Sequence, residues 1–264
     1  MSWRKYLTSA SMEIQAAAQF RMNFFLSILV EALPLIGLLY LWIFVFNDGG
    51  DLYGYSAAQV ITYYVIGTAV AGWLPTVWWE VSDNIRDGSL TRFLVLPINY
   101  LGYYFSREIA SQLVYFSMTL MVILPVILLL HPYLMLAAPV NLLLFIASLL
   151  VGFCLTFMMQ SCIHLLAFWF DSVTGFLSVF SLVSAFLSGA FFPLDFLPEP
   201  FLRITAVLPF QYLRFTPLQI YLGNIGVRSA LMSLAAAAAY TIVFYLAAGF
   251  LWRRGASRYA APGG

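Results

Sequence analysis

The sequence predicts an all-α polytopic membrane protein with six transmembrane helices, on the basis of its composition and its pattern of apolar segments. Of the 264 residues, 63% are hydrophobic and only 9% are charged, whereas a soluble domain is about half apolar and about a quarter charged. A water-soluble globule could not cover its surface with so few charges. The 2 cysteines and the net charge of +1 also disfavour a disulfide-stabilised extracellular protein and a nucleic-acid-binding protein.

Residues 1–22 are predicted to form an N-terminal amphipathic helix that lies in the membrane interface. Five residues recur at spacings of three and four, as on one face of a helix: Trp3, Leu7, Ala10, Ile14 and Ala17. A tryptophan beside the basic pair Arg4 and Lys5 suits the level of the lipid headgroups. The alternative is a frayed terminus.

Six apolar segments are long enough to cross about 30 Å of hydrocarbon, for which a helix needs about 20 residues. They are Asn23–Phe46, Gln59–Trp79, Ile109–Leu130, Val140–Phe168, Thr174–Phe192 and Ser229–Trp252. Basic residues lie before the first segment, between the second and third, and after the sixth, while the loops after the first and third have none. Because Arg and Lys are enriched in cytoplasmic loops, both termini are predicted to be cytoplasmic. Residues 23–252 thus contain the six spans, and residues 253–264 form a cytoplasmic tail.

The connection 80–107 is predicted to be a cytoplasmic docking region. Its apolar residues keep a one-sided pattern: Val81, Ile85, Leu90, Phe93, Leu94 and Pro97. Gly88 can end a helix in the left-handed conformation, and a second short helix would begin after Ser89 and stop before Pro97. The alternative is an ordinary solvated loop, although solvated loops seldom keep an apolar stripe.

The segment 193–228 is predicted to form re-entrant or interfacial helices on the extracytoplasmic side. It is apolar, but five prolines divide it into pieces too short to span: Pro193, Pro198, Pro200, Pro209 and Pro217. Irregular backbone at membrane depth is tolerated where protein or water covers it. The alternative, a seventh span, would place the C-terminal arginines outside and break the charge asymmetry.

These motifs resemble those of the ABC transporter type-2 permease family. Its cytoplasmic signature has a Gly, a small hydroxyl residue and a Leu, followed by a Leu and a Pro, which is similar to Asp87-Gly88-Ser89-Leu90 with Leu94 and Pro97. The stretch Ser188–Pro193 with Leu197-Pro198 and Leu208-Pro209-Phe210 is similar to the family's segment after the fifth span, and Trp252-Arg253-Arg254-Gly255 resembles one bacterial branch. Thr91 departs from the pattern, because many members carry an acidic residue there.

The resemblance implies a permease subunit of an exporter in the bacterial cytoplasmic membrane. A separate ABC ATPase subunit would bind ATP and Mg, and a second permease, identical or a sister chain, would complete the complex. The contact with the ATPase would use Ile85, Arg86, Asp87, Gly88, Leu90, Arg92, Leu94 and Pro97. The sequence agrees with a separate ATPase, because its single lysine, Lys5, does not follow a glycine and a P-loop is therefore impossible. We expect no catalytic site, no metal site, no cofactor in this chain and no nucleic-acid partner.

Candidate pathway residues lie in the first, second and fifth spans. Glu31 is the only acidic residue well inside a predicted span, where an acid costs about 3 kcal/mol unless it is paired, hydrated or protonated. It either faces the permeation cavity or is a neutral packing residue. The second span contributes Thr62, Thr68 and Trp73, and the fifth contributes Ser178, Ser181 and Ser188.

A face of small residues either packs closely against another helix or lines a mildly polar path. The resemblance implies that the second and fifth spans flank a central cavity between two permeases. Aromatic and hydroxyl side chains with few charges suggest an amphipathic or hydrophobic substrate. Two other interpretations stay open. A secondary transporter would show internal repeats and paired charges in mid-membrane, and a non-transporting scaffold would need no docking region.

Overall fold

The structure is a computed structural model that describes residues 21–46, 53–75, 80–95 and 99–259; the side chains of residues 21–32 and 122 are outside this description. The regular elements of these ranges are helices, which confirms the predicted all-α class. The interfacial helix predicted for residues 1–22 lies almost entirely outside the described residues and stays a prediction.

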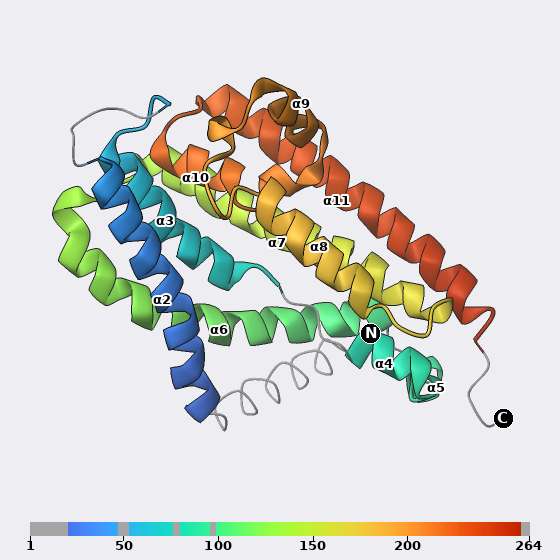
Figure 1. Ribbon diagram of the computed structural model, residues 1–264. Helices are drawn as coiled ribbons and strands as arrows, with labels where there is room; N and C mark the ends of the chain where they lie inside the picture. Colours follow the sequence, from blue (N-terminus) through green and yellow to red (C-terminus); the bar gives the residue numbers. More distant parts are fainter. Residues whose placement is uncertain (1–20, 47–52, 76–79, 96–98, 260–264) are drawn as a thin grey trace.

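The helices in chain order are α2 (Arg21–Val45), α3 (Ala57–Trp73), α4 (Glu80–Arg86), α5 (Leu90–Leu94), α6 (Tyr100–Leu130), α7 (Pro139–Leu165), α8 (Thr174–Leu187), α9 (Glu199–Val207), α10 (Phe215–Leu222) and α11 (Val227–Ala256). Four 3₁₀ turns lie between them: η1 (His131–Tyr133), η2 (Leu166–Phe168), η3 (Leu194–Phe196) and η4 (Pro209–Leu213). Helices α7, α8 and α11 run along one another with α3 beside them, while α2 crosses α3 and α6 (Figure 1).

Three helical stretches among the described residues are long and apolar enough to cross a membrane. They are Tyr100–Tyr133, Pro139–Phe168 and Val227–Ala256. Two shorter apolar stretches lie at Leu33–Val45 and Thr174–Leu187. These helices agree with a polytopic membrane protein, and the count of six spans stays a prediction.

Helices α3 and α8 are shorter than the second and fifth spans that the sequence predicts. Helix α3 ends at Trp73, because Leu74 takes an extended backbone immediately before Pro75 and a residue before proline avoids the helical region. Helix α8 ends at Leu187, and soon after it Gly189 has a φ of +79°. Glycine takes this left-handed conformation without steric cost, so the chain can turn there.

Helix α6 is longer than the third predicted span, because it begins earlier, at Tyr100. The side chain of Asn99 caps this end by accepting a hydrogen bond of 2.9 Å from the backbone N–H of Gly102. The added turns bring the start of α6 beside α4, where Arg107 pairs with Glu80 at 2.7 Å.

The segment 193–228 is divided into short helices where the prolines predict breaks. Pro193 immediately precedes η3, Pro198 immediately precedes α9, and Pro209 is the first residue of η4. Because Pro fits the first turn of a helix but not its interior, the four pieces stay short. The depth of this segment in the membrane stays a prediction.

Two apolar clusters lie toward opposite ends of the helices. The first joins α2, α3 and α10 and includes Leu35, Tyr64, Val65, Leu218 and Ile220. The second joins α4, α5, α6, α7 and α11 and includes Val81, Leu90, Tyr104, Leu165 and Ala248. The second cluster fixes the short connection α4–α5 to the body of the protein.

A polar network ties η3 and α10 to the start of α3. Asp195 accepts hydrogen bonds from the Tyr55 hydroxyl at 2.5 Å and from the Gln219 amide at 2.7 Å. Asn224 donates to Gln219 at 2.6 Å and accepts from Gln59 at 3.0 Å. Burial raises the pKa of Tyr55, and the hydrogen bond to Asp195 raises it further. The network therefore holds the segment 193–228 against α3.

Candidate functional site

The α4–α5 hairpin (residues 80–95) has the helix–glycine–helix form that the sequence predicts. Gly88 separates the two helices with a φ of +87°. Asp87 accepts a hydrogen bond of 2.9 Å from the Ser89 N–H, and bonds from Ser89 lower the pKa of the Asp87 carboxyl. The Ser89 hydroxyl does not cap α5; it donates to Asn84 at 2.5 Å. These contacts fix a tight turn at the tip of the hairpin.

The apolar stripe of the hairpin packs mainly on its own chain. Val81, Ile85, Leu90 and Phe93 are buried against side chains of α6, α7 and α11, and the Phe93 ring lies 5.2 Å from that of Tyr100. The sequence predicts that this stripe forms the surface of a docking region, whereas in the structure it packs on the protein itself. Periodicity identifies the residues that share a face, but it does not say what covers the face.

The surface that the hairpin leaves for a partner is polar with a small apolar part. Arg86, Asp87 and Arg92 are exposed, and the Leu94 side chain is 46% exposed. Ile85 and Leu90, which the sequence analysis also assigns to the ATPase contact, lie beneath this surface. Pro97 is outside the described residues.

The hairpin lies at the end of the molecule where α11 ends. The Trp252 ring stacks on Tyr100 with 4.8 Å between ring centroids, next to the hairpin. Three further arginines of this end are exposed: Arg253, Arg254 and Arg258. Figure 1 shows α4, α5 and the end of α11 on the same side of the molecule, away from α9 and α10.

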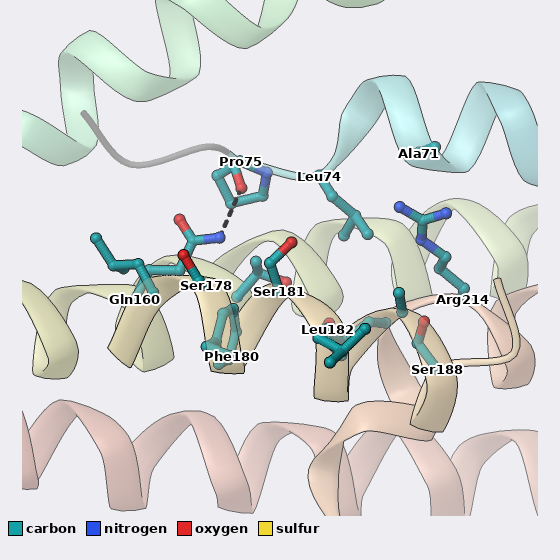
Figure 2. Close-up of a pocket in the computed structure, with 15 residues that line it drawn as sticks. Ala71, Leu74, Pro75, Gln160, Ser178, Phe180, Ser181, Leu182, Ser188 and Arg214 are labelled. Carbon is teal, nitrogen blue, oxygen red and sulfur yellow. Dashed lines mark hydrogen bonds between the residues drawn. The ribbon is translucent and has the colours of Figure 1, made fainter. Parts of the chain in front are cut away.

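A cavity of about 730 Å³ lies between α8, the end of α3, α7 and the start of α10. Helix α8 contributes Ser178, Ser181 and Ser184 to its wall, and Ser188 lines it just after the helix ends. Figure 2 shows Gln160 and Ser178 at one end of the cavity and Ser188 and Arg214 at the other. Gln160 donates a hydrogen bond of 3.1 Å to the Pro75 carbonyl, which anchors the chain after α3 to α7.

The serine face of α8 lines this cavity rather than packing on another helix of the chain. Ser178 and Ser181 are exposed, and no residue of α8 is buried. Ser188, just after α8, is only 1% exposed, and its hydroxyl has no hydrogen-bond partner among the described residues. Within one chain this face therefore lies on the cavity wall, and its role in a pathway stays a prediction.

The second-span candidates do not gather at this cavity. Thr62 is buried, and its hydroxyl donates to the Ala58 carbonyl at 2.7 Å and accepts from the Met135 N–H at 2.9 Å. Trp73 donates through its ring N–H to the Leu149 carbonyl at 3.0 Å. Both residues therefore fasten α3 to its neighbours.

Thr68 and the first-span candidate relate to a second, smaller cavity. Thr68 lines a space of about 250 Å³ together with Leu35 and Leu38 of α2, and its hydroxyl donates to the Tyr64 carbonyl at 2.9 Å. Glu31 lies in α2, one helical turn before Leu35, and its side chain is outside the described residues.

Arg214 lines both cavities and was not among the candidates from the sequence. A hydrogen bond of 2.9 Å from the Phe215 N–H to the Ser188 carbonyl brings the start of α10 beside the end of α8. An arginine in an apolar segment is a signal that sequence reasoning could have used, because such charges inside membranes mark functional positions.

Residues 32–263 match the family model described as ABC-2 family transporter protein. No match was found among curated proteins or among solved structures. Members of this family are membrane components without an ATPase site of their own, and the family in general implies an ABC ATPase partner. The matched region runs from within α2 to beyond α11 and includes both the hairpin and the cavity. On this evidence the chain belongs to the ABC-2 family of transporter proteins.

Proposed function

We propose that this chain is the permease subunit of an ATP-binding cassette exporter that moves an amphipathic or hydrophobic substrate across the membrane. The observation that carries the proposal is the cavity of about 730 Å³ between α3, α7, α8 and α10, which combines serine and arginine side chains with apolar ones such as Leu177 and Phe180. A mainly apolar cavity with a few polar groups suits an amphipathic ligand. ATP and Mg are bound by a separate ATPase subunit.

The hairpin transmits the movement of the ATPase to the helices around the cavity. Arg86, Asp87, Arg92 and Leu94 form the contact surface. Beneath it, Leu90 is buried in a cluster that includes residues of α6, α7 and α11. Movement of the hairpin is therefore passed to these helices, which extend past the cavity. The ATPase then favours one of two conformations of the permease, because its contacts differ between them.

The proposed topology has six spans with both termini in the cytoplasm of a bacterial cell and the chain in its cytoplasmic membrane. The grouping of Arg86, Arg92 and the arginines at the end of α11 on one side of the molecule supports this orientation. Helices α9 and α10 then lie at the extracytoplasmic side as re-entrant or interfacial elements.

A second permease completes the pathway. Helix α8 buries none of its residues within one chain, and its apolar residues Phe176, Val179 and Phe186 are exposed. These side chains are available for lipid and for a second permease, either an identical copy or a sister chain. Two cavities facing each other would form a central path.

The test is copurification of the tagged chain with the ATPase encoded by an adjacent reading frame. We expect a complex whose recovery is lost in Leu94→Asp, because a charge enters the exposed apolar part of the contact. Ser257→Asp is the matched control, since Ser257 is exposed on the same side of the molecule at the end of α11. Recovery of no ATPase, with substrate movement driven by an ion gradient, favours a secondary transporter. Recovery of no ATPase and no movement favours a scaffold.

A further inference from the structure

Arg214 presents a positive charge to two cavities without a counter-charge in the described part of the chain. No ion pair involves it, and no acidic side chain lines either cavity among the described residues. An unpaired charge in an apolar surrounding is unfavourable. A ligand that supplies a negative charge would remove this penalty.

The backbone holds Arg214 in place from both sides. Leu213, before it, is 1% exposed. After it, the Phe215 N–H donates to the Ser188 carbonyl, and the Leu218 N–H donates to the Arg214 carbonyl at 3.1 Å. The Arg214 side chain therefore leaves from a fixed point, which reduces the entropy that binding would cost.

Ser188 adds a second hydrogen-bond donor for an anion beside Arg214. Its hydroxyl is buried and has no hydrogen-bond partner in the part of the chain that the structure describes. Figure 2 shows the Ser188 hydroxyl and the Arg214 side chain at the same end of the cavity. A buried hydroxyl without a partner is costly, and an anionic oxygen that accepts from it would satisfy it.

Away from this end, the cavity wall is apolar or carries uncharged hydroxyl groups. Leu177, Phe180 and Leu182 provide apolar surface, while Ser181 and Ser184 provide neutral hydroxyls. The cavity is thus polarised, with one cation at one end and no cation elsewhere in its described wall. A ligand with a charged head and an apolar tail fits this distribution.

We propose that the cavity binds the anionic group, a phosphate or a carboxylate, of an amphipathic substrate through the Arg214 guanidinium and the Ser188 hydroxyl. The inference rests on the proposed permease function and narrows its substrate class. Arginine suits this role because its planar fork matches the oxygens of phosphate and carboxylate. The ligand is either an anionic membrane lipid or a single-chain anionic amphiphile.

The test measures the Kd of the purified full-length chain, in a neutral maltoside detergent, for dodecyl phosphate, for fluorescent phosphatidylglycerol and for dodecyltrimethylammonium. We expect dodecyl phosphate or phosphatidylglycerol to bind at least tenfold more tightly than the cationic probe. Arg214→Gln should raise the Kd of the anionic probe at least tenfold, Arg214→Lys should raise it less, and Ser188→Ala should raise it severalfold. Arg203→Gln is the control, because Arg203 is exposed on α9 and pairs with Glu199 at 2.8 Å.

The two anionic probes distinguish the sources of the ligand, and binding of either supports the site. Equal affinity for anionic and cationic probes, or an unchanged Kd in Arg214→Gln, overturns it. If Arg214→Gln does not give a folded protein by gel filtration, Arg214→Lys and Ser188→Ala decide, and an unchanged Kd in both overturns the site. Binding is measured without ATP or ATPase, so a failure of ATP coupling leaves this result intact. Conversely, ATP-driven transport without a preference for anionic substrates would contradict the proposed anion site but leave the permease function standing.

Discussion

Truncation of Leu90, the buried side chain at the base of the α4–α5 hairpin, tests how much its packing stabilises the hairpin. Leu90 is 0% exposed and lies in the cluster that joins α5 to α6, α7 and α11. Leu90→Ala removes about three carbon groups worth about 0.8 kcal/mol each and leaves a cavity, so the expected loss is about 2–4 kcal/mol. If the hairpin opens as a local unit, this loss lowers the protection of its amides about 30- to 700-fold, at tenfold per 1.4 kcal/mol.

Hydrogen exchange followed by mass spectrometry measures this protection over residues 80–95. The matched control is Leu94→Ala in the same helix, where the side chain is 46% exposed and the loss should stay below about 1 kcal/mol. We expect Leu90→Ala to weaken coupling with the ATPase complex bound, and Leu94→Ala to weaken binding of the ATPase itself. Equal loss of protection in the two variants would refute the packing of the stripe on the protein's own core.

Three further substitutions test the turn, a helix contact and the polar network. Gly88→Ala places a side chain at a φ of +87° and should cost about 1–2 kcal/mol, seen as faster exchange in the hairpin. Gly72→Ala would bring a methyl group within 2.5 Å of the Thr119 side chain of α6 and should lower the melting temperature through a loss of about 1–3 kcal/mol; Gly249→Ala, which meets nothing within 4 Å, should not lower it. Asp195→Asn leaves its donors with a weaker acceptor and should cost about 1–3 kcal/mol, read as increased proteolysis within residues 193–228; wild-type resistance would contradict the network.

Local backbone chemistry was the part of the fold that sequence reasoning predicted best. The left-handed Gly88 and the prolines of segment 193–228 act on their immediate neighbours, so their effects can be read without knowing the tertiary fold. The early ends of α3 and α8 follow the same chemistry, since Pro75 and Gly189 cause them. A search for runs of apolar residues passed over these two positions.

Contacts between distant parts of the chain were harder to predict. The stripe containing Ile85 and Leu90 was identified, but only the structure shows that it packs on the protein itself. Thr62 and Trp73 have the chemistry of pathway residues, yet their polar groups bond the backbone of neighbouring segments. Arg214 gains its importance from its place beside Ser188, and no spacing in the sequence encodes that proximity.

The central claim is that an ATPase drives this permease from the cytoplasmic side through the α4–α5 hairpin. The most direct measurement is labelling of Arg92→Cys with a membrane-impermeant maleimide, in a chain whose Cys154 and Cys162 have been replaced by alanine. We expect labelling in inverted membrane vesicles and none in intact cells, with the opposite result for Arg203→Cys on α9. Labelling of Arg92→Cys in intact cells would place the hairpin outside and contradict the claim.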